Sequence, residues 1–237
     1  MAALSMMCEE QRKSALTGKD ATLWIRAAAE SGVCVAQLLL GRMLLAGVGV
    51  AKDEAAAKFW FERAAHAGDP DARNMLGRCY ESGWGTLRDP VEAARHYAIS
   101  AQFGCTWAQY NLGHLYLNGI GVRRHPPAAY LLYLQAAQHG HERAMNLVGR
   151  CHEQGWGCAM DRMQARRWYK KSAQCGYFRG AYNFASILVE DGCLAGAIYW
   201  FSRAIGGAPE PTRTFMLSSL SCSDQPLIQA LASNLSK

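Results

Sequence analysis

The chain has 237 residues, of which 50% are hydrophobic and 19% are charged, and its formal net charge is +6 at pH 7. No run of 18 apolar residues occurs, so the sequence excludes a membrane-spanning helix. The net positive charge is mild, and the sequence lacks the strong basic stripe that is typical of nucleic-acid-binding proteins. We therefore expect no nucleic-acid partner. Residues 1–19 lack the apolar segment of a secretory signal, and we therefore expect a cytoplasmic protein.

Glycine recurs at a fixed interval of 36 residues. Four series show it: Gly41, Gly77, Gly113 and Gly149; Gly47, Gly83, Gly119 and Gly155; Gly49, Gly85, Gly121 and Gly157; and Gly32, Gly68, Gly104, Gly140 and Gly176. A period of this length indicates stacked supersecondary units. Such a stack offers a long surface and usually no catalytic pocket, which favours a binding scaffold and predicts that the chain is not an enzyme.

In chain order, residues 1–20 are predicted to form an N-terminal cap, and residues 21–32 match only the second half of a unit. The full unit is clearest at residues 71–104. Its apolar residues at i, i+4, i+7 and i+8 predict a first helix, called helix A, over residues 71–82. Gly83 then ends helix A, and Gly85 allows a second tight turn. Asp89 and Pro90 predict the N-cap and first position of a second helix, helix B, which ends at Gly104.

Three other units repeat this pattern, with Asp53 and Asp161 at the N-cap of helix B and His125 in its place in the third unit. A fifth unit is shortened between its two helices, as terminal repeats commonly are. The remaining segment, residues 206–237, carries two short helical patterns, Thr212–Leu220 and Asp224–Leu235, which predict C-terminal capping helices.

The nine cysteines are odd in number and irregular in spacing, which favours reduced thiols. Cys79 and Cys151 share one position of the unit, where other units have Met43, Leu115 and Leu188, so both are expected in the core. Disulfides in an oxidising compartment are the alternative.

The combination A-x-x-x-L-G-x-x-Y-x-x-G-x-G, then Asp, then A-x-x-W-[FY]-x-x-A-A-x-x-G resembles the Sel1-like repeat family over residues 21–205. Leu44 and His152, which replace the expected Tyr, depart from that pattern. The resemblance implies an all-α fold: a right-handed α/α solenoid, related to tetratricopeptide repeats, of about five helical hairpins with capping helices at both ends. It also implies a bacterial, non-enzymatic adaptor for a protein or peptide partner, with no cofactor.

In stacked hairpins helix A lines the concave face, so the exposed positions of helix A are the candidate partner-binding site. Asparagine can bond an extended peptide backbone, and arginine suits carboxylates. The predicted partner-binding residues are Asn74, Arg78, Tyr110, His114, Asn146, Arg150 and Asn183. The alternative is structural: Arg78 with Glu81, and Arg150 with Glu153, are i,i+3 pairs that satisfy each other, and the asparagines bond the backbones of neighbouring helices.

Trp84 and Trp156 occupy the Gly-x-Gly loops, where they are either exposed anchors for a partner or residues packed on the next hairpin. Helix B of the fourth unit has a basic cluster, which either contacts phosphates or an acidic partner or is a solvated face: Arg162, Arg166, Arg167, Lys170 and Lys171.

No phosphate-binding, serine-hydrolase or zinc-protease motif is present. His139 and His141, with Cys175 or Cys105, have the residue types for a metal site, but no C-x-x-C supports them and we expect no metal. Two functions besides the adaptor remain open: an immunity protein that neutralises an effector of type VI secretion, and a nucleic-acid reader, which Glu81 and Glu153 disfavour.

Overall fold

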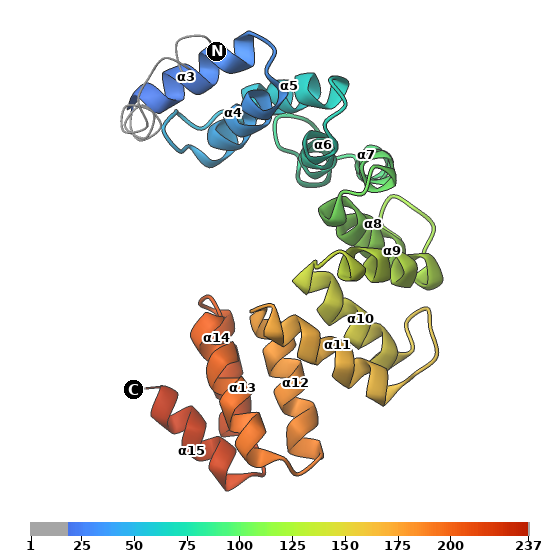
Figure 1. Cartoon of the computed structure of the whole chain (residues 1–237), viewed down its shortest axis with the longest axis vertical. Coiled ribbons are helices and arrows are strands. Elements are labelled where there is room, and N and C mark those ends of the chain that lie inside the picture. Colours follow the sequence, from blue (N-terminus) through green and yellow to red (C-terminus); the bar gives the residue numbers. More distant parts are fainter. Residues whose placement is uncertain (1–18, 237) are drawn as a thin grey trace. The chain divides into compact units, whose positions relative to one another are not determined.

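The computed structural model describes residues 19–236, which form thirteen helices and no strand (Figure 1). The prediction of an all-α chain of successive helical hairpins is therefore confirmed. The chain divides into two compact units, one extending to Arg124 and the other beginning at His125. The predicted N-terminal cap, residues 1–20, lies almost entirely outside the described residues.

Within residues 19–124, the first unit contains six helices, each packed against the next along the chain, and α6 also contacts α8. They are α3 (Lys19–Glu30), α4 (Cys34–Ala46), α5 (Glu54–His66), α6 (Pro70–Ser82), α7 (Pro90–Gln102) and α8 (Thr106–Asn118). Helix α3 is the lone helix B that the sequence predicts for residues 21–32. The pairs α4/α5 and α6/α7 are complete hairpins of helix A and helix B, and α8 is the helix A that follows them.

The second unit contains seven helices: α9 (Pro126–Gln138), α10 (Glu142–Gln154), α11 (Arg162–Gln174), α12 (Phe178–Glu190), α13 (Leu194–Gly207), α14 (Thr212–Ser221) and α15 (Pro226–Leu235). Only Asp191, Gly192 and Cys193 separate α12 from α13, which is the shortening predicted for the fifth unit. Helices α14 and α15 are the two short helices predicted near the C-terminus, and both contact α13.

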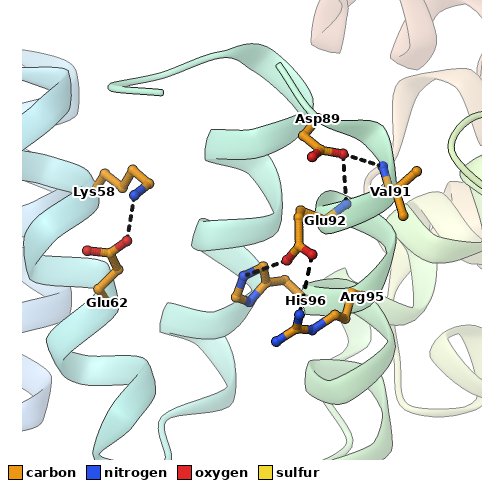
Figure 2. Close-up of polar contacts among 7 residues, drawn as sticks. All are labelled: Lys58, Glu62, Asp89, Val91, Glu92, Arg95 and His96. Carbon is orange, nitrogen blue, oxygen red and sulfur yellow. Dashed lines mark hydrogen bonds and ion pairs between the residues drawn. The ribbon is translucent and has the colours of Figure 1, made fainter. Parts of the chain in front are cut away.

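Helix B begins where an N-cap side chain accepts a backbone hydrogen bond. The Asp89 carboxylate accepts from the amides of Val91 at 3.0 Å and Glu92 at 3.1 Å, as Figure 2 shows. Asp53 and Asp161 cap α5 and α11 in the same way. These bonds satisfy amides that the helix itself leaves unpaired. His125 replaces the aspartate of α9 without loss of the cap, because its Nδ1 accepts from the Ala128 amide at 3.0 Å.

Helix A contains a glycine where helix B comes closest to it. A Cβ added at Gly77 would lie 2.5 Å from Cε1 of the Tyr97 ring. Gly41 faces Phe61 and Gly149 faces Tyr169 in the same manner. The first glycine series of the sequence therefore marks close contact between the two helices of one hairpin, where an aromatic ring fills the space a side chain would need.

The second glycine of each Gly-x-Gly loop packs against the preceding helix B. Gly85 has φ +64°, and a Cβ there would collide with the backbone carbonyl of Glu54 at the start of α5. Gly157 approaches the carbonyl of Pro126 in the second unit in the same way. This glycine therefore has two functions: it allows the left-handed turn expected from the sequence, and it lets neighbouring hairpins make backbone contact.

The core of each unit consists of small residues and rings. Alanines from both helices are buried beside Phe61 in the first unit and Tyr169 in the second. Cys79 and Cys151 are buried in this layer, as predicted, and burial raises the pKa of each thiol to about 12. All eight cysteines among the described residues are free thiols.

Candidate functional site

The predicted partner-binding residues fall into two sets, one in each compact unit. The first unit holds Asn74 and Arg78 on α6 and Tyr110 and His114 on α8, and the second holds Asn146 and Arg150 on α10 and Asn183 on α12. Because α6 contacts α8 and α10 contacts α12, each set belongs to two helices A that lie against each other.

The asparagines form hydrogen bonds between neighbouring helices A. Asn111 Nδ2 donates to Asn74 Oδ1 at 3.0 Å, and Asn183 Nδ2 donates to Asn146 Oδ1 at 2.8 Å. The acceptors are only 6% and 5% exposed. The bonds link two side chains, not a side chain and a backbone as the structural alternative supposed. A buried amide needs such a partner, so these asparagines hold the hairpins together.

The two arginines are exposed and lie over tryptophan rings. Arg78 Cζ is 4.8 Å from the centroid of the Trp84 ring, and Arg150 Cζ is 4.9 Å from that of Trp156. Both tryptophans are half-buried, and Trp84 packs against the core of the first unit. The core that Trp84 contacts consists of residues from α3, α4, α5 and α6, so Trp84 packs on its own hairpin and the preceding one, whereas the alternative placed it on the next hairpin. Its ring also supports a guanidinium.

Glu81 and Glu153 do not neutralise the arginines three residues before them. The Tyr97 hydroxyl donates to Glu81 Oε2 at 2.6 Å, and the Tyr169 hydroxyl donates to Glu153 Oε2 at 3.0 Å. Burial raises the pKa of both phenols, and the neighbouring glutamate raises it further, so both stay protonated donors. The i,i+3 ion pairs expected in the structural alternative are therefore wrong, because a tyrosine from helix B holds each carboxylate.

On α8, three aromatic side chains form a ladder. The Tyr110 and His114 rings meet edge to face with centroids 4.9 Å apart, and Trp107 meets Tyr110 at 6.0 Å. Tyr110 and His114 are partly buried. These two predicted residues therefore belong to an aromatic surface, whereas the equivalent positions of the neighbouring units hold an asparagine and an arginine.

The basic cluster of α11 is partly neutralised. Arg162 pairs with Asp191 at 2.7 Å and with Glu190 at 3.1 Å, and Arg166 pairs with Asp191 at 3.5 Å. Lys171 Nζ lies 4.4 Å from the centroid of the Trp168 ring on the same helix. Ion pairs therefore link the start of α11 to the end of α12.

A cysteine and a histidine lie together in the second unit. Cys158 Sγ is 3.7 Å from His152 Nδ1, and Tyr130 Oη is 3.3 Å from His152 Nε2. Burial raises the pKa of Cys158 and so favours the protonated thiol, whereas a nucleophilic cysteine needs the thiolate. Across residues 19–236 no group of three His, Cys, Asp or Glu side chains could hold a metal ion, and no helix is long and apolar enough to cross a membrane.

Sequence reasoning missed Asn111 as a partner of Asn74, and Tyr97 and Tyr169 as anchors of the glutamates. It singled out Trp84 and Trp156 but not their contact with the arginines. One signal was available. Asn111 follows Asn74 by 37 residues, the same interval that separates Asn183 from Asn146, whereas Tyr110 was aligned with Asn74 at the glycine interval of 36. Glu81 and Tyr97 recur 72 residues later as Glu153 and Tyr169, but the recurrence by itself does not show that the two residues of a pair contact each other.

Comparison with known proteins identifies the repeats. The family model described as "Sel1 repeat" matches residues 34–69, 70–102, 108–141 and 142–177, more than half of the chain. No curated protein matches the chain.

Solved structures agree with this match. A Sel1 repeat protein from Oxalobacter formigenes is 32% identical with a TM-score of 0.75, and the match covers 80% of each chain. A protective antigen of uropathogenic Escherichia coli strains, displaying an SLR fold, is 24% identical with a TM-score of 0.72; the match covers 92% of this chain but only 50% of that one. An immunity protein from Pseudomonas aeruginosa is 17% identical with a TM-score of 0.56, covering 84% of this chain and 75% of that protein. With four matched repeats and the hairpins described above, the chain belongs to the Sel1 repeat family.

Proposed function

We propose that this chain is a non-enzymatic interaction module that binds a peptide or protein segment on the exposed face of its helices A. Sel1 repeat proteins generally mediate protein–protein interaction. An adaptor role in the bacterial cytoplasm is part of the proposal, and the bacterial sources of the similar structures support it.

One observation carries this proposal. Arg78 and Arg150 occupy the same position of two repeats, both are exposed, and neither forms an ion pair with a described residue. A guanidinium that is supported by an indole and has no carboxylate of its own is available to a partner. The buried asparagines hold the helices beneath this face, and direct contact with the partner is assigned to the arginines and to Tyr110 and His114.

The alternative hypothesis, that the chain neutralises a secreted effector, draws on the likeness to the immunity protein. That likeness is 17% identity and supports the fold alone. Neutralisation would use the same helix-A face with one folded enzyme as the partner, so it is a special case of the binding function.

A random-peptide selection on the whole chain tests the binding function. Peptides selected by the wild type should bind at least tenfold more weakly to Arg78→Ala/Arg150→Ala. The control Arg95→Ala/Arg167→Ala removes two exposed arginines from helices B and should leave binding unchanged. Circular dichroism should show equal helix content in all three proteins. Binding that is lost equally in the control, or kept in the helix-A variant, would show that the exposed helix-A face is not the binding surface.

A further inference from the structure

Two hairpins share a group of four side chains that the other hairpins lack. The group recurs after 72 residues (150 − 78 and 169 − 97) and consists of an arginine, a glutamate, a tryptophan and a tyrosine. The members are Arg78, Glu81, Trp84 and Tyr97, called the Arg78 cluster, and Arg150, Glu153, Trp156 and Tyr169, called the Arg150 cluster. The first hairpin has Arg42, Leu45, Val48 and Phe61 at these positions.

The geometry of the two clusters is nearly the same. The guanidinium lies 4.8 Å above the tryptophan ring in the Arg78 cluster and 4.9 Å in the Arg150 cluster. The tyrosine hydroxyl lies 2.6 Å and 3.0 Å, respectively, from a glutamate oxygen. Each cluster lies within one compact unit, so each arrangement is complete without the other.

The arrangement keeps each arginine apart from the nearest acid on its own helix. An arginine and a glutamate three residues apart on an exposed helix commonly pair. Here the buried tyrosine binds the glutamate. Among the described residues the arginines form no ion pair, and the sulfur of Met75, 3.8 Å from Arg78, is a weak acceptor. A guanidinium above a ring directs its N–H groups sideways, toward solvent or a ligand.

The two charges of a cluster define the ligand chemistry. The guanidinium offers paired donors that match a carboxylate, and the glutamate has a second oxygen, Oε1, that can accept an N–H. A multiply charged phosphate would meet the negative charge of the glutamate one turn away. A peptide supplies both complementary groups, a side-chain carboxylate and a backbone amide.

We propose that each cluster binds one acidic side chain of a partner protein, with the arginine taking the carboxylate and the glutamate accepting a nearby backbone N–H. This inference rests on the proposed function and specifies its partner: an extended segment rich in Asp and Glu. Trp84 and Trp156 are positioning residues, because they hold the guanidinium and do not themselves recognise charge.

The experiment uses the random-peptide selection on the whole chain. Peptides selected by the wild type should be enriched in Asp and Glu relative to the starting pool, and Arg78→Gln/Arg150→Gln should select a pool without that enrichment. The control Arg95→Gln/Arg167→Gln should select the acidic pool. A selected six-residue peptide should bind at two sites per chain by isothermal titration calorimetry, at one site in either single variant, and with at least tenfold lower affinity (about 1.4 kcal/mol) in the double variant.

Two further measurements examine the chemistry. Replacing the acidic residues of the peptide by Gln or Asn should weaken binding at least tenfold, and raising the salt concentration should weaken it as well. Arg78→Lys/Arg150→Lys keeps the charge but loses the flat fork, and should bind more weakly than the wild type. Trp84→Leu/Trp156→Leu should weaken binding while the preference for acidic peptides remains.

The outcomes separate this inference from the proposed function. Selected peptides that depend on helix-A residues but are not acidic would overturn the inference and leave the binding function intact. Peptides that are insensitive to both arginines would overturn both. Displacement of the peptide by a single-stranded RNA, or tighter binding when its glutamates are replaced by phosphoserine, would show that phosphate is the preferred ligand and would also overturn the inference.

Discussion

The hydrogen bond between Tyr97 and Glu81 should stabilise the second hairpin by a measurable coupling energy. The bond is 2.6 Å long, its donor is fully buried and its acceptor is a half-buried carboxylate. Hydrogen bonds to charged groups contribute about 1.5–3 kcal/mol. Tyr97→Phe should lower the free energy of unfolding by about 1.5 kcal/mol, near the lower limit of that range, because water can reach the released carboxylate.

Glu81→Leu should cost about 2 kcal/mol, because it leaves the buried Tyr97 hydroxyl without an acceptor. The double variant recreates the Phe61 and Leu45 of the first hairpin, where both side chains contact a continuous apolar core. We therefore expect it to lose only about 1 kcal/mol, which gives a coupling energy of about 2.5 kcal/mol.

Urea denaturation at pH 7, followed by far-ultraviolet circular dichroism, measures the four free energies of unfolding. Tyr97→Phe combined with Glu92→Gln is the matched control, because Glu92 contacts Arg95 and His96 on its own helix α7 and not Tyr97 (Figure 2). Those two changes should be additive. A Tyr97–Glu81 coupling energy within about 0.5 kcal/mol of zero would refute the assignment of the tyrosine as the anchor of the glutamate.

Two further predictions concern the glycines and the thiols. Gly68 has φ +93° and open space around it, so Gly68→Ala should lower the free energy of unfolding only by the strain of a left-handed alanine, about 1–2 kcal/mol. Gly85→Ala should lower it clearly more, because the added Cβ meets the Glu54 backbone. Equal melting temperatures of the two variants would contradict this. Burial raises the thiol pKa of Cys79 and Cys151 from 9.0 to about 12, so their contribution to stability is complete below pH 9 and is lost as the pH rises toward 12. Between pH 9.5 and 11, the stability of Cys79→Ala/Cys151→Ala should fall less steeply than that of the wild type, by about 2 kcal/mol per pH unit, and parallel curves in urea denaturation would contradict this.

Much of the fold could be predicted because its signals are local and repeated. An N-cap aspartate such as Asp89 depends on amides two and three residues away, and Gly83 ends α6 through its own backbone conformation. The spacing of the repeat positions and the apolar patterns near the C-terminus also predicted the shortened connection before α13 and the two C-terminal helices. Local rules are enough here, since each hairpin presents the same apolar face to its neighbour.

The candidate site was predictable only in outline. The columns of helix A correctly placed Arg78 and Arg150 on the surface, but they gave the same role to Asn74 and Asn146, which are buried. A period shows which residues are equivalent, not which of them face solvent. That distinction depends on the rotation of each helix against its neighbour, which brought Asn111 and not Tyr110 to Asn74.

The sequence by itself therefore determined the repeat, the helices, the N-caps of helix B and the buried alanines, glycines and cysteines, because these follow from contacts between residues close in the chain or at equivalent positions. The tertiary structure decided how the charged side chains are paired. Glu81 could pair with Arg78 on its own helix or with Tyr97 on the next one, and only the closeness of α6 and α7 settles that choice. Pairing across helices depends on distances in space, and a residue interval of 16 carries no such information.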